Sequence, residues 1–167
     1  MLEPALIIRP TTDTDWREVR ALRLEMLQDT PEAFGETFAA ASAHPESEWR
    51  MRAARGMSAT GASLVAIYQG EWAGTMGVFL PEDEDPMLVG VYVTPRFRGP
   101  QFGVADALLA GIEEWASTRG STLTLHVHEV NARAQAYYRK RGFRVTGRTF
   151  PYALNARERE LEMQKPL

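Results

Sequence analysis

One segment of the chain carries the residue types that hold a phosphate group. It spans residues 91–105, VYVTPRFRGPQFGVA, and passes from an apolar run through a loop with two glycines into an amphipathic stretch. Such a strand–loop–helix turn can aim several backbone N–H groups and the helix dipole at one anion. Glycine allows the backbone to approach closely, and Arg98 could add a charge-assisted hydrogen bond. Because the same turn also serves as an ordinary connection, a second motif is needed to identify the ligand.

That second motif spans residues 131–143, NARAQAYYRKRGF, which follow an alternating apolar run and end in Gly-Phe. Asn131 opens a predicted helix, and Tyr138 lies on it with a phenol that can donate a proton. By its pattern alone, Tyr138 is typical of a half-buried aromatic on an amphipathic helix. A catalytic role therefore depends on the motif as a whole.

Taken together, the two segments resemble the GNAT (Gcn5-related N-acetyltransferase) superfamily. Its late motif has an Asn, an Ala three residues on, a Tyr seven residues on and Gly-Phe at its end. The residues at those spacings here are Asn131, Ala134, Tyr138, Gly142 and Phe143. The upstream strand matches through Leu123, Leu125 and Val127, and the phosphate segment matches through Val91, Val93, Pro95, Arg98 and Gly99.

The phosphate loop departs from the family pattern, which is usually Arg-Gly-x-Gly-x-Gly or Ala. Here Arg98-Gly99 begins the loop and Gly103-Val104-Ala105 ends it, with two extra residues between. Pro100 lacks an N–H and cannot donate to a phosphate. We expect a wider loop or one with a donor fewer, and the pattern leaves open whether Arg98 reaches the phosphates and whether coenzyme A binds more weakly.

The resemblance implies a site for acetyl-CoA with no metal. The pantetheine arm would lie along the backbone of Val91, Tyr92 and Val93 at a splay in the sheet, with a backbone N–H of this strand stabilising the oxyanion. Asn131 would bind near the pantetheine, and Tyr138 would be the catalytic acid that protonates the departing thiolate. Tyr137 is the rival for this role, but it lies one residue away from the position that the family motif gives its tyrosine. The pyrophosphate would be held by backbone groups of residues 98–106, among them Arg98, Gly99, Gly103, Val104 and Ala105.

The residue that removes a proton from the attacking amine is left open. The candidates are Glu36, Asp83, Glu84, His126, His128 and Glu129. Both histidines alternate with apolar residues in a predicted strand, which is also typical of partly buried imidazoles with satisfied hydrogen bonds. The carboxylates of residues 82–85 could attract a cationic acceptor or simply form a solvated turn.

The elements that must position these residues follow from periodicity. Helices are predicted at 12–29, 45–55, 103–119 and 131–141, and strands at 5–9, 64–68, 72–80, 87–93, 123–127, 145–150 and 158–164. This mixed order predicts an α/β (α+β) fold with helices on the faces of a sheet. The resemblance implies the GNAT fold, a mixed, mostly antiparallel sheet of six to seven strands flanked by four helices, as a single domain over residues 1–167.

Composition excludes several other classes of protein. The 167 residues contain no cysteine, which excludes a disulfide scaffold, a thiolate zinc site and a cysteine nucleophile. A net charge of −3 offers no basic footprint for nucleic acid. The sequence has no run of the roughly 20 apolar residues that are needed to span a membrane, and no signal peptide is recognisable. We therefore expect a cytoplasmic protein.

The expected function is transfer of an acetyl group from acetyl-CoA to a primary amine, by direct attack in a ternary complex. The acceptor could be a small molecule or a peptide, and a homodimer is left open. The alternative is a module of the same fold that binds acetyl-CoA as a sensor or partner subunit without useful turnover.

Overall fold

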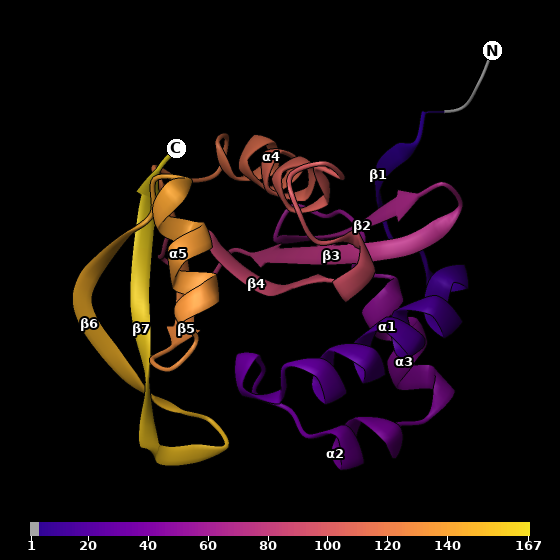
Figure 1. The fold of residues 1–167 in the computed structure, drawn as a ribbon, viewed down its shortest axis with the longest axis horizontal. Helices are drawn as coiled ribbons and strands as arrows, with labels where there is room; N and C mark the ends of the chain where they lie inside the picture. Colours follow the sequence, from indigo (N-terminus) through magenta and orange to yellow (C-terminus); the bar gives the residue numbers. More distant parts are fainter. Residues whose placement is uncertain (1–3) are drawn as a thin grey trace.

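The structure is a computed structural model that describes residues 4–167. One seven-stranded sheet, ordered β1-β2-β3-β4-β5-β7-β6, runs through it (Figure 1). Neighbouring strands are antiparallel except for the β4–β5 pair, which is parallel. The strands are β1 (Leu6–Pro10), β2 (Gly61–Tyr68), β3 (Glu71–Phe79), β4 (Met87–Val93), β5 (Thr122–His128), β6 (Arg144–Tyr152) and β7 (Asn155–Pro166).

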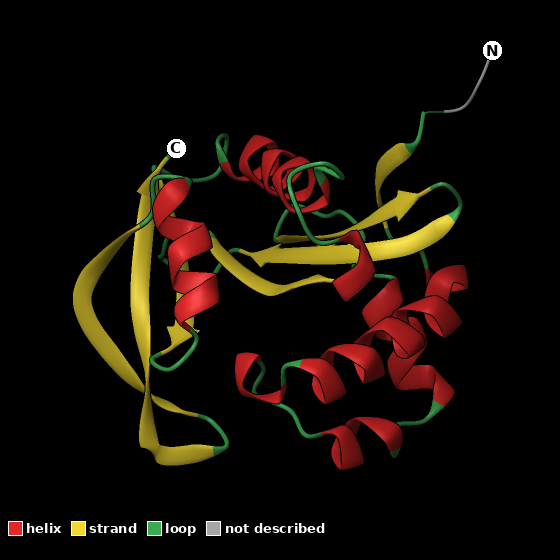
Figure 2. Cartoon of the chain, in the orientation of Figure 1, coloured by secondary structure: helices red, strands yellow, loops and turns green. Residues whose placement is uncertain are grey.

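Helices cover both faces of this sheet (Figure 2). α4 and α5 lie on one face, and the three N-terminal helices lie on the other. The helices are α1 (Trp16–Asp29), α2 (Phe38–Ser42), α3 (Glu46–Ala53), α4 (Val104–Ala116) and α5 (Ala132–Lys140). The fold is thus the α/β arrangement expected from the sequence. No helix in the described part of the chain is long and apolar enough to cross a membrane.

The short helix α2 replaces a segment that the sequence predicts as loop. Thr37 caps it, because its hydroxyl accepts a hydrogen bond from the Ala40 N–H at 3.1 Å. With only five residues it is too short to show a helical period of apolar side chains. The four predicted helices correspond to α1, α3, α4 and α5.

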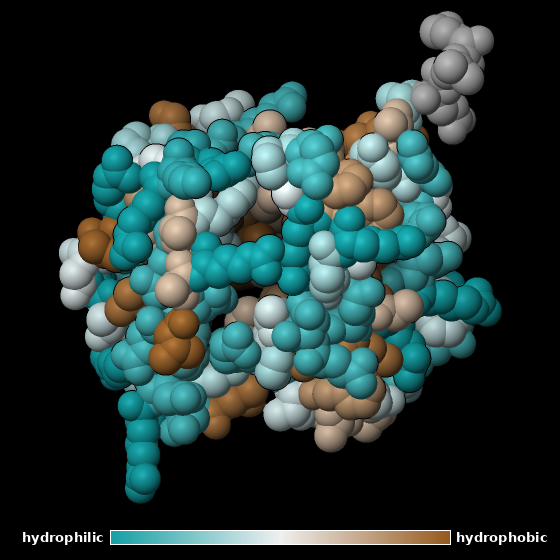
Figure 3. Space-filling model, in the orientation of Figure 1, coloured by the Kyte–Doolittle hydropathy of each residue, from teal (hydrophilic) through white to brown (hydrophobic). Residues whose placement is uncertain are grey.

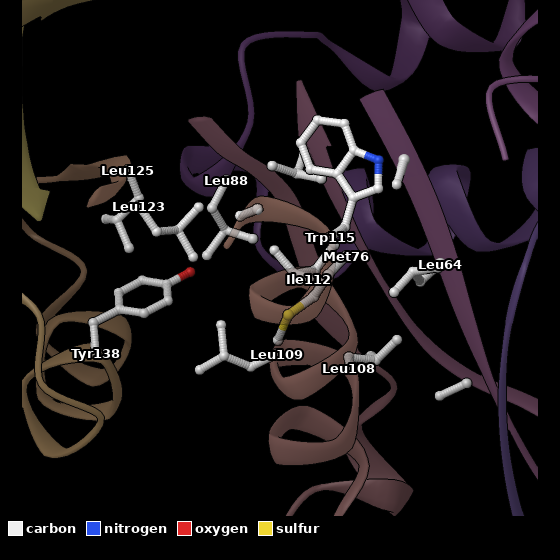
Figure 4. Close-up of a cluster of buried hydrophobic side chains, with 14 of the residues drawn as sticks. Leu64, Met76, Leu88, Leu108, Leu109, Ile112, Trp115, Leu123, Leu125 and Tyr138 are labelled. Atoms are coloured by element: carbon white, nitrogen blue, oxygen red, sulfur yellow. The ribbon is translucent and has the colours of Figure 1, made fainter. Parts of the chain in front are cut away.

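The main core lies between α4 and the sheet, and it is drawn in Figure 4. Leu108, Ile112 and Trp115 of α4 are buried against side chains from the sheet. α4 approaches β2 closely, since a Cβ at Gly111 would lie 2.8 Å from the Leu64 side chain. A smaller cluster around the buried Trp49 packs α1 and α3 together on the opposite face.

The sheet opens between β4 and β5. The two strands are paired only at Met87 and Thr124, so β4 turns away from β5 beyond that point. Opposite Met76 of β3, β4 has two residues, Gly90 and Val91, which form a β-bulge with Gly90 at a φ of 61°. The backbone of β4 facing β5 is therefore free of strand partners along most of its length.

Candidate active site

Two clefts meet at this opening in the sheet. A large cleft of about 1080 Å³ lies between the N-terminal helices and the sheet, and a small cleft of about 460 Å³ lies between β4, β5, α4 and α5. In the space-filling view the surface is hollowed near its centre (Figure 3). The wall shared by both clefts, which we call the junction, consists of Ala33, Phe34, Leu88, Val89, Gly90 and His126. Two molecules bound in the two clefts would meet there.

The small cleft brings together all the residues that the sequence predicts for acetyl-CoA binding and for the catalytic acid. These come from β4, from the loop before α4 and the first turn of α4, and from α5 and its N-cap. They are Val91, Tyr92, Val93, Arg98, Gly99, Gly103, Val104, Ala105, Asn131 and Tyr138.

Backbone donors at the start of α4 provide an anion site in this cleft. Gly103 caps the helix in a left-handed conformation, with φ of 67°, and its carbonyl accepts the Ala107 N–H at 3.0 Å. The N–H groups of Val104, Ala105 and Asp106 have no acceptor among residues 4–167. Free N–H groups and the helix dipole at one point suit a pyrophosphate.

The loop accommodates its two extra residues by packing Phe102 against the core. A turn is closed by the Phe102 N–H and the Gly99 carbonyl at 3.2 Å. The Phe102 ring meets Tyr68 and Phe97 edge-on, with centroids 5.4 and 5.8 Å away. The insertion is thus anchored, and α4 still begins at the cleft.

Along β4, backbone orientation separates the three predicted pantetheine contacts. The Thr94 N–H donates to the Ala73 carbonyl of β3 at 2.9 Å. Backbone groups of successive residues point to opposite sides of a strand. The backbone N–H and C=O of Tyr92 therefore also face β3, whereas those of Val91 and Val93 face the small cleft. The Tyr92 side chain packs in the cluster on the α1 side of the sheet. Val91 and Val93 therefore fit a strand-like contact with pantetheine better than Tyr92 does.

The guanidinium of Arg98 is bound within the protein. Its Nε donates to the Val93 carbonyl at 2.8 Å, and Nη2 pairs with Asp29 of α1 at 2.5 Å. The side chain therefore braces the loop against α1, and the loop contributes its backbone to the cleft.

Basic side chains at the C-terminal end of α5 and at its C-cap, which the sequence analysis overlooked, line the small cleft instead. Lys140 and Arg141 both reach it. Arg141 pairs with Asp106 at 2.7 Å, and Tyr137 donates to the same carboxylate at 3.0 Å. Lys140 has no ion pair in the described chain. The basic run at residues 139–141 was the signal in the sequence.

Tyr138 is a buried phenol that lines the small cleft, with 6% of the residue exposed. In Figure 4 its hydroxyl points away from α5 toward Leu88, a residue of the junction. Burial raises the pKa of Tyr138, so the phenol keeps its proton. The hydroxyl of the neighbouring Tyr137 is instead engaged by Asp106.

Asn131 has a structural task as the cap of α5. Its Oδ1 accepts the Ala134 N–H at 3.2 Å, which explains why an Asn begins this helix. The Nδ2 group is the remaining donor of this amide, and the residue lines the small cleft.

Several candidate bases do not suit the task. Glu36 accepts hydrogen bonds from Arg52, His44 and Arg23, which lower its pKa to about 2, with Arg52 the largest cause. A carboxylate held in its ionised form is a poor proton acceptor near neutral pH. The remaining acidic candidates, Asp83, Glu84 and Glu129, line neither cleft.

The two histidines differ in what their nitrogens meet. His128 is buried, its Nδ1 accepts the Val130 N–H at 3.2 Å, and its Nε2 faces Glu158 at 3.5 Å. His126 belongs to the junction and stacks on Phe150 with centroids 4.4 Å apart. Its Nε2 lies 3.4 Å from the buried Glu162, which can only accept when ionised, so Nδ1 is the nitrogen left to accept a proton.

Comparisons with known proteins agree with this geometry. Residues 22–143 match the profile of the Acetyltransferase (GNAT) family. The chain is similar to an uncharacterized N-acetyltransferase of Mycobacterium tuberculosis, Rv2669, with 35% identity over 53% of this chain, and the match spans only 57% of that relative. It is also similar to the peptidyl-lysine N-acetyltransferase YjaB of Salmonella typhimurium, with 32% identity over 65% of this chain and 83% of the relative.

Among solved structures, a ribosomal-protein-alanine N-acetyltransferase from Brucella melitensis superposes with a TM-score of 0.70 at 27% identity, over 96% of this chain and 99% of that one. The family match covers more than half of the chain, and the fold agrees along nearly all of it. The chain belongs to the acetyltransferase (GNAT) family.

Proposed function

We propose that the protein is an acyl-CoA-dependent N-acetyltransferase that transfers an acetyl group from acetyl-CoA to a primary amine. The observation that carries the proposal is the junction, where the cleft with the phosphate-type loop meets a second, larger cleft. The relatives support an amine acceptor, because the YjaB protein is named for peptidyl-lysine and the Brucella protein for a ribosomal-protein alanine. A small-molecule amine or a peptide would occupy the large cleft.

In the small cleft, acetyl-CoA would lie with its pyrophosphate at the free N–H groups of Val104, Ala105 and Asp106. Its pantetheine would follow the backbone of Val91 and Val93, adding a strand where β4 lacks one. The thioester would then reach the bulge at Gly90, where a backbone N–H would stabilise the oxyanion.

The reaction itself would be a direct attack in a ternary complex. The amine nitrogen forms a bond to the acyl carbon, and the bond from that carbon to sulfur breaks. The departing thiolate takes the proton of the Tyr138 phenol, and the proton that nitrogen loses on forming the amide restores the phenol. General acid catalysis of this kind contributes about 10²–10⁴-fold.

Before it attacks, the amine must lose the proton it carries near neutral pH, since alkyl ammonium groups have pKa values of about 10. His126 would accept that proton at Nδ1, while Glu162 holds the ring through Nε2. This role follows from its place at the junction, where an amine in the large cleft would approach the thioester.

The test begins with calorimetric titration of acetyl-CoA and of CoA into the purified protein. We expect micromolar binding, followed by release of free thiol when a panel of amines is added. Tyr138→Phe should keep the affinity for acetyl-CoA and lower kcat by about 10²-fold or more.

Two results would contradict the proposal. Absence of binding at millimolar acetyl-CoA would mean that the lengthened loop no longer holds the pyrophosphate. Binding without thiol release for every amine of the panel would favour a binding module over an enzyme.

A further inference from the structure

The charged groups that line the large cleft do not balance. Three arginines, Arg23, Arg52 and Arg55, line it together with two glutamates, Glu36 and Glu160. Guanidinium groups in proteins keep their charge, so the excess is positive. A cleft that receives a cationic amine would be expected to carry the opposite excess.

The three arginines differ in how many of their donors are used. Arg52 is fully engaged, since both Nη atoms bind Glu36 and its Nε binds Glu48. Arg23 gives only its Nε to Glu36, at 3.0 Å, and its two Nη groups have no acceptor among residues 4–167. Arg55 makes no side-chain hydrogen bond or ion pair in the described chain, although it lines the cleft.

The free donors of Arg23 lie beside the junction. The guanidinium carbon of Arg23 is 5.0 Å from the centroid of the Phe34 ring, and Phe34 lines both clefts. With 23% of its side chain exposed, Arg23 is largely removed from water. Burial lowers the pKa of Arg23. The positive charges of Arg52 and Arg55 lower this pKa further, whereas Glu36 raises it. An anion bound here would offset both effects.

From these donors we infer that the acceptor carries, besides its amine, an anionic carboxylate or phosphate group that Arg23 and Arg55 bind. This inference rests on the proposed function. The planar guanidinium fork binds either oxyanion through paired hydrogen bonds. Glu160 and His126, which also line the large cleft, would face the ammonium group. The cleft thus offers groups for both charges of a zwitterionic amine.

Three pairs of amines test the inference, each pair differing only in the anionic group or its replacement. They are glycine with glycinamide, 4-aminobutanoate with 4-aminobutanamide, and O-phosphoethanolamine with ethanolamine. We expect kcat/KM to favour the anionic member by at least about tenfold, as for a hydrogen bond to a charged group. Glycinamide is the weaker base and has more free amine near neutral pH, so intrinsic reactivity works against this result. The carboxylate and phosphate pairs separate the two sources of the anion.

Substitutions then locate the site. Arg55→Met should lower the preference for the anionic member by about tenfold, and Arg23→Met should lower it at least as much. Arg50→Met is the matched control, because Arg50 pairs with Glu46 and lines neither cleft. The control should keep the wild-type preference.

The outcomes distinguish failure of the inference from failure of the proposed function. Acetylation of both members of each pair at similar rates would overturn the inference and leave acetyl transfer standing. If no amine of the panel is acetylated, these six included, the proposed function fails, and binding decides the inference. Calorimetric binding of 4-aminobutanoate or O-phosphoethanolamine to the CoA complex, lost in Arg55→Met, would support it, and absence of binding would overturn it.

Discussion

His126 is the one junction residue, among those the structure describes, whose side chain can take up a proton. Replacement by Gln keeps a similar size and removes that ability. We expect His126→Gln to lower kcat/KM by about 10²–10³-fold at neutral pH and to flatten its rise with pH. The measurement is a pH–rate profile at saturating acetyl-CoA.

His44→Gln is the control for that variant, because His44 also contacts a carboxylate, Glu36, but lines neither cleft. Its profile should keep the shape of the wild type. A His126→Gln variant with full activity and an unchanged profile would remove the residue from the mechanism.

A second residue-scale prediction concerns the acid. Burial raises the pKa of Tyr138, so its proton is retained at pH values where an exposed tyrosine ionises. The rate should therefore not decline through ionisation of this phenol as pH rises to about 10. Loss of activity in wild type at about pH 9, while the fold is intact by circular dichroism, would contradict this state of Tyr138.

The loop before α4 is the element on which affinity for acetyl-CoA depends. Phe102 anchors it through edge-on contacts with Tyr68 and Phe97, and each such contact contributes about 0.5–1.5 kcal/mol. We expect Phe102→Ala to lower the free energy of unfolding by about 1–3 kcal/mol and to weaken acetyl-CoA binding about tenfold. Denaturant unfolding and calorimetry measure the two effects.

Phe102→Leu separates the anchor from the aromatic ring. It keeps an apolar side chain at the same position, so binding should stay within about threefold of wild type. If Phe102→Ala binds acetyl-CoA as tightly as wild type does, acetyl-CoA binding at the free N–H groups of α4 does not depend on the contacts that Phe102 makes with the core.

On the scale of the whole molecule, Glu36 joins three segments that line the large cleft, namely its own loop, α1 and α3. It lies between Phe34 and α2, and it binds Arg23 of α1 and Arg52 of α3. Its pKa is lowered from 4.5 to about 2 in the folded protein, so it contributes stability above about pH 4.5 that is lost as pH falls toward 2. At neutral pH this contribution is up to about 3 kcal/mol.

The variant Glu36→Gln should therefore be less stable than wild type at pH 7, by up to about 3 kcal/mol, and the difference should shrink steadily below pH 4.5. Urea unfolding at pH 7, 5, 4 and 3 measures it. Glu46→Gln removes an exposed pair with Arg50 and should change stability by less than about 0.5 kcal/mol. A constant difference between Glu36→Gln and wild type at every pH would show that the ion pairs are not its source.

Much of this molecule follows from local sequence. The period of apolar residues predicts the strands and four of the five helices, because an element's own side chains show which of its faces is buried. The resemblance carried by the motif likewise implies one site for Asn131 and Tyr138, and both residues line the small cleft. The helix α2 was missed because five residues carry no period.

Contacts between residues far apart in the chain decided the rest. Pairing of Arg98 with Asp29, 69 residues away, directs its guanidinium to α1. Among the candidate bases, the sequence could not choose between Glu36 and His126. The folded chain surrounds Glu36 with cations and brings His126 to the junction, because proton affinity depends on neighbouring charge and burial. Sequence alone thus determined the family motif and its elements, and tertiary structure determined which side chains are free to act.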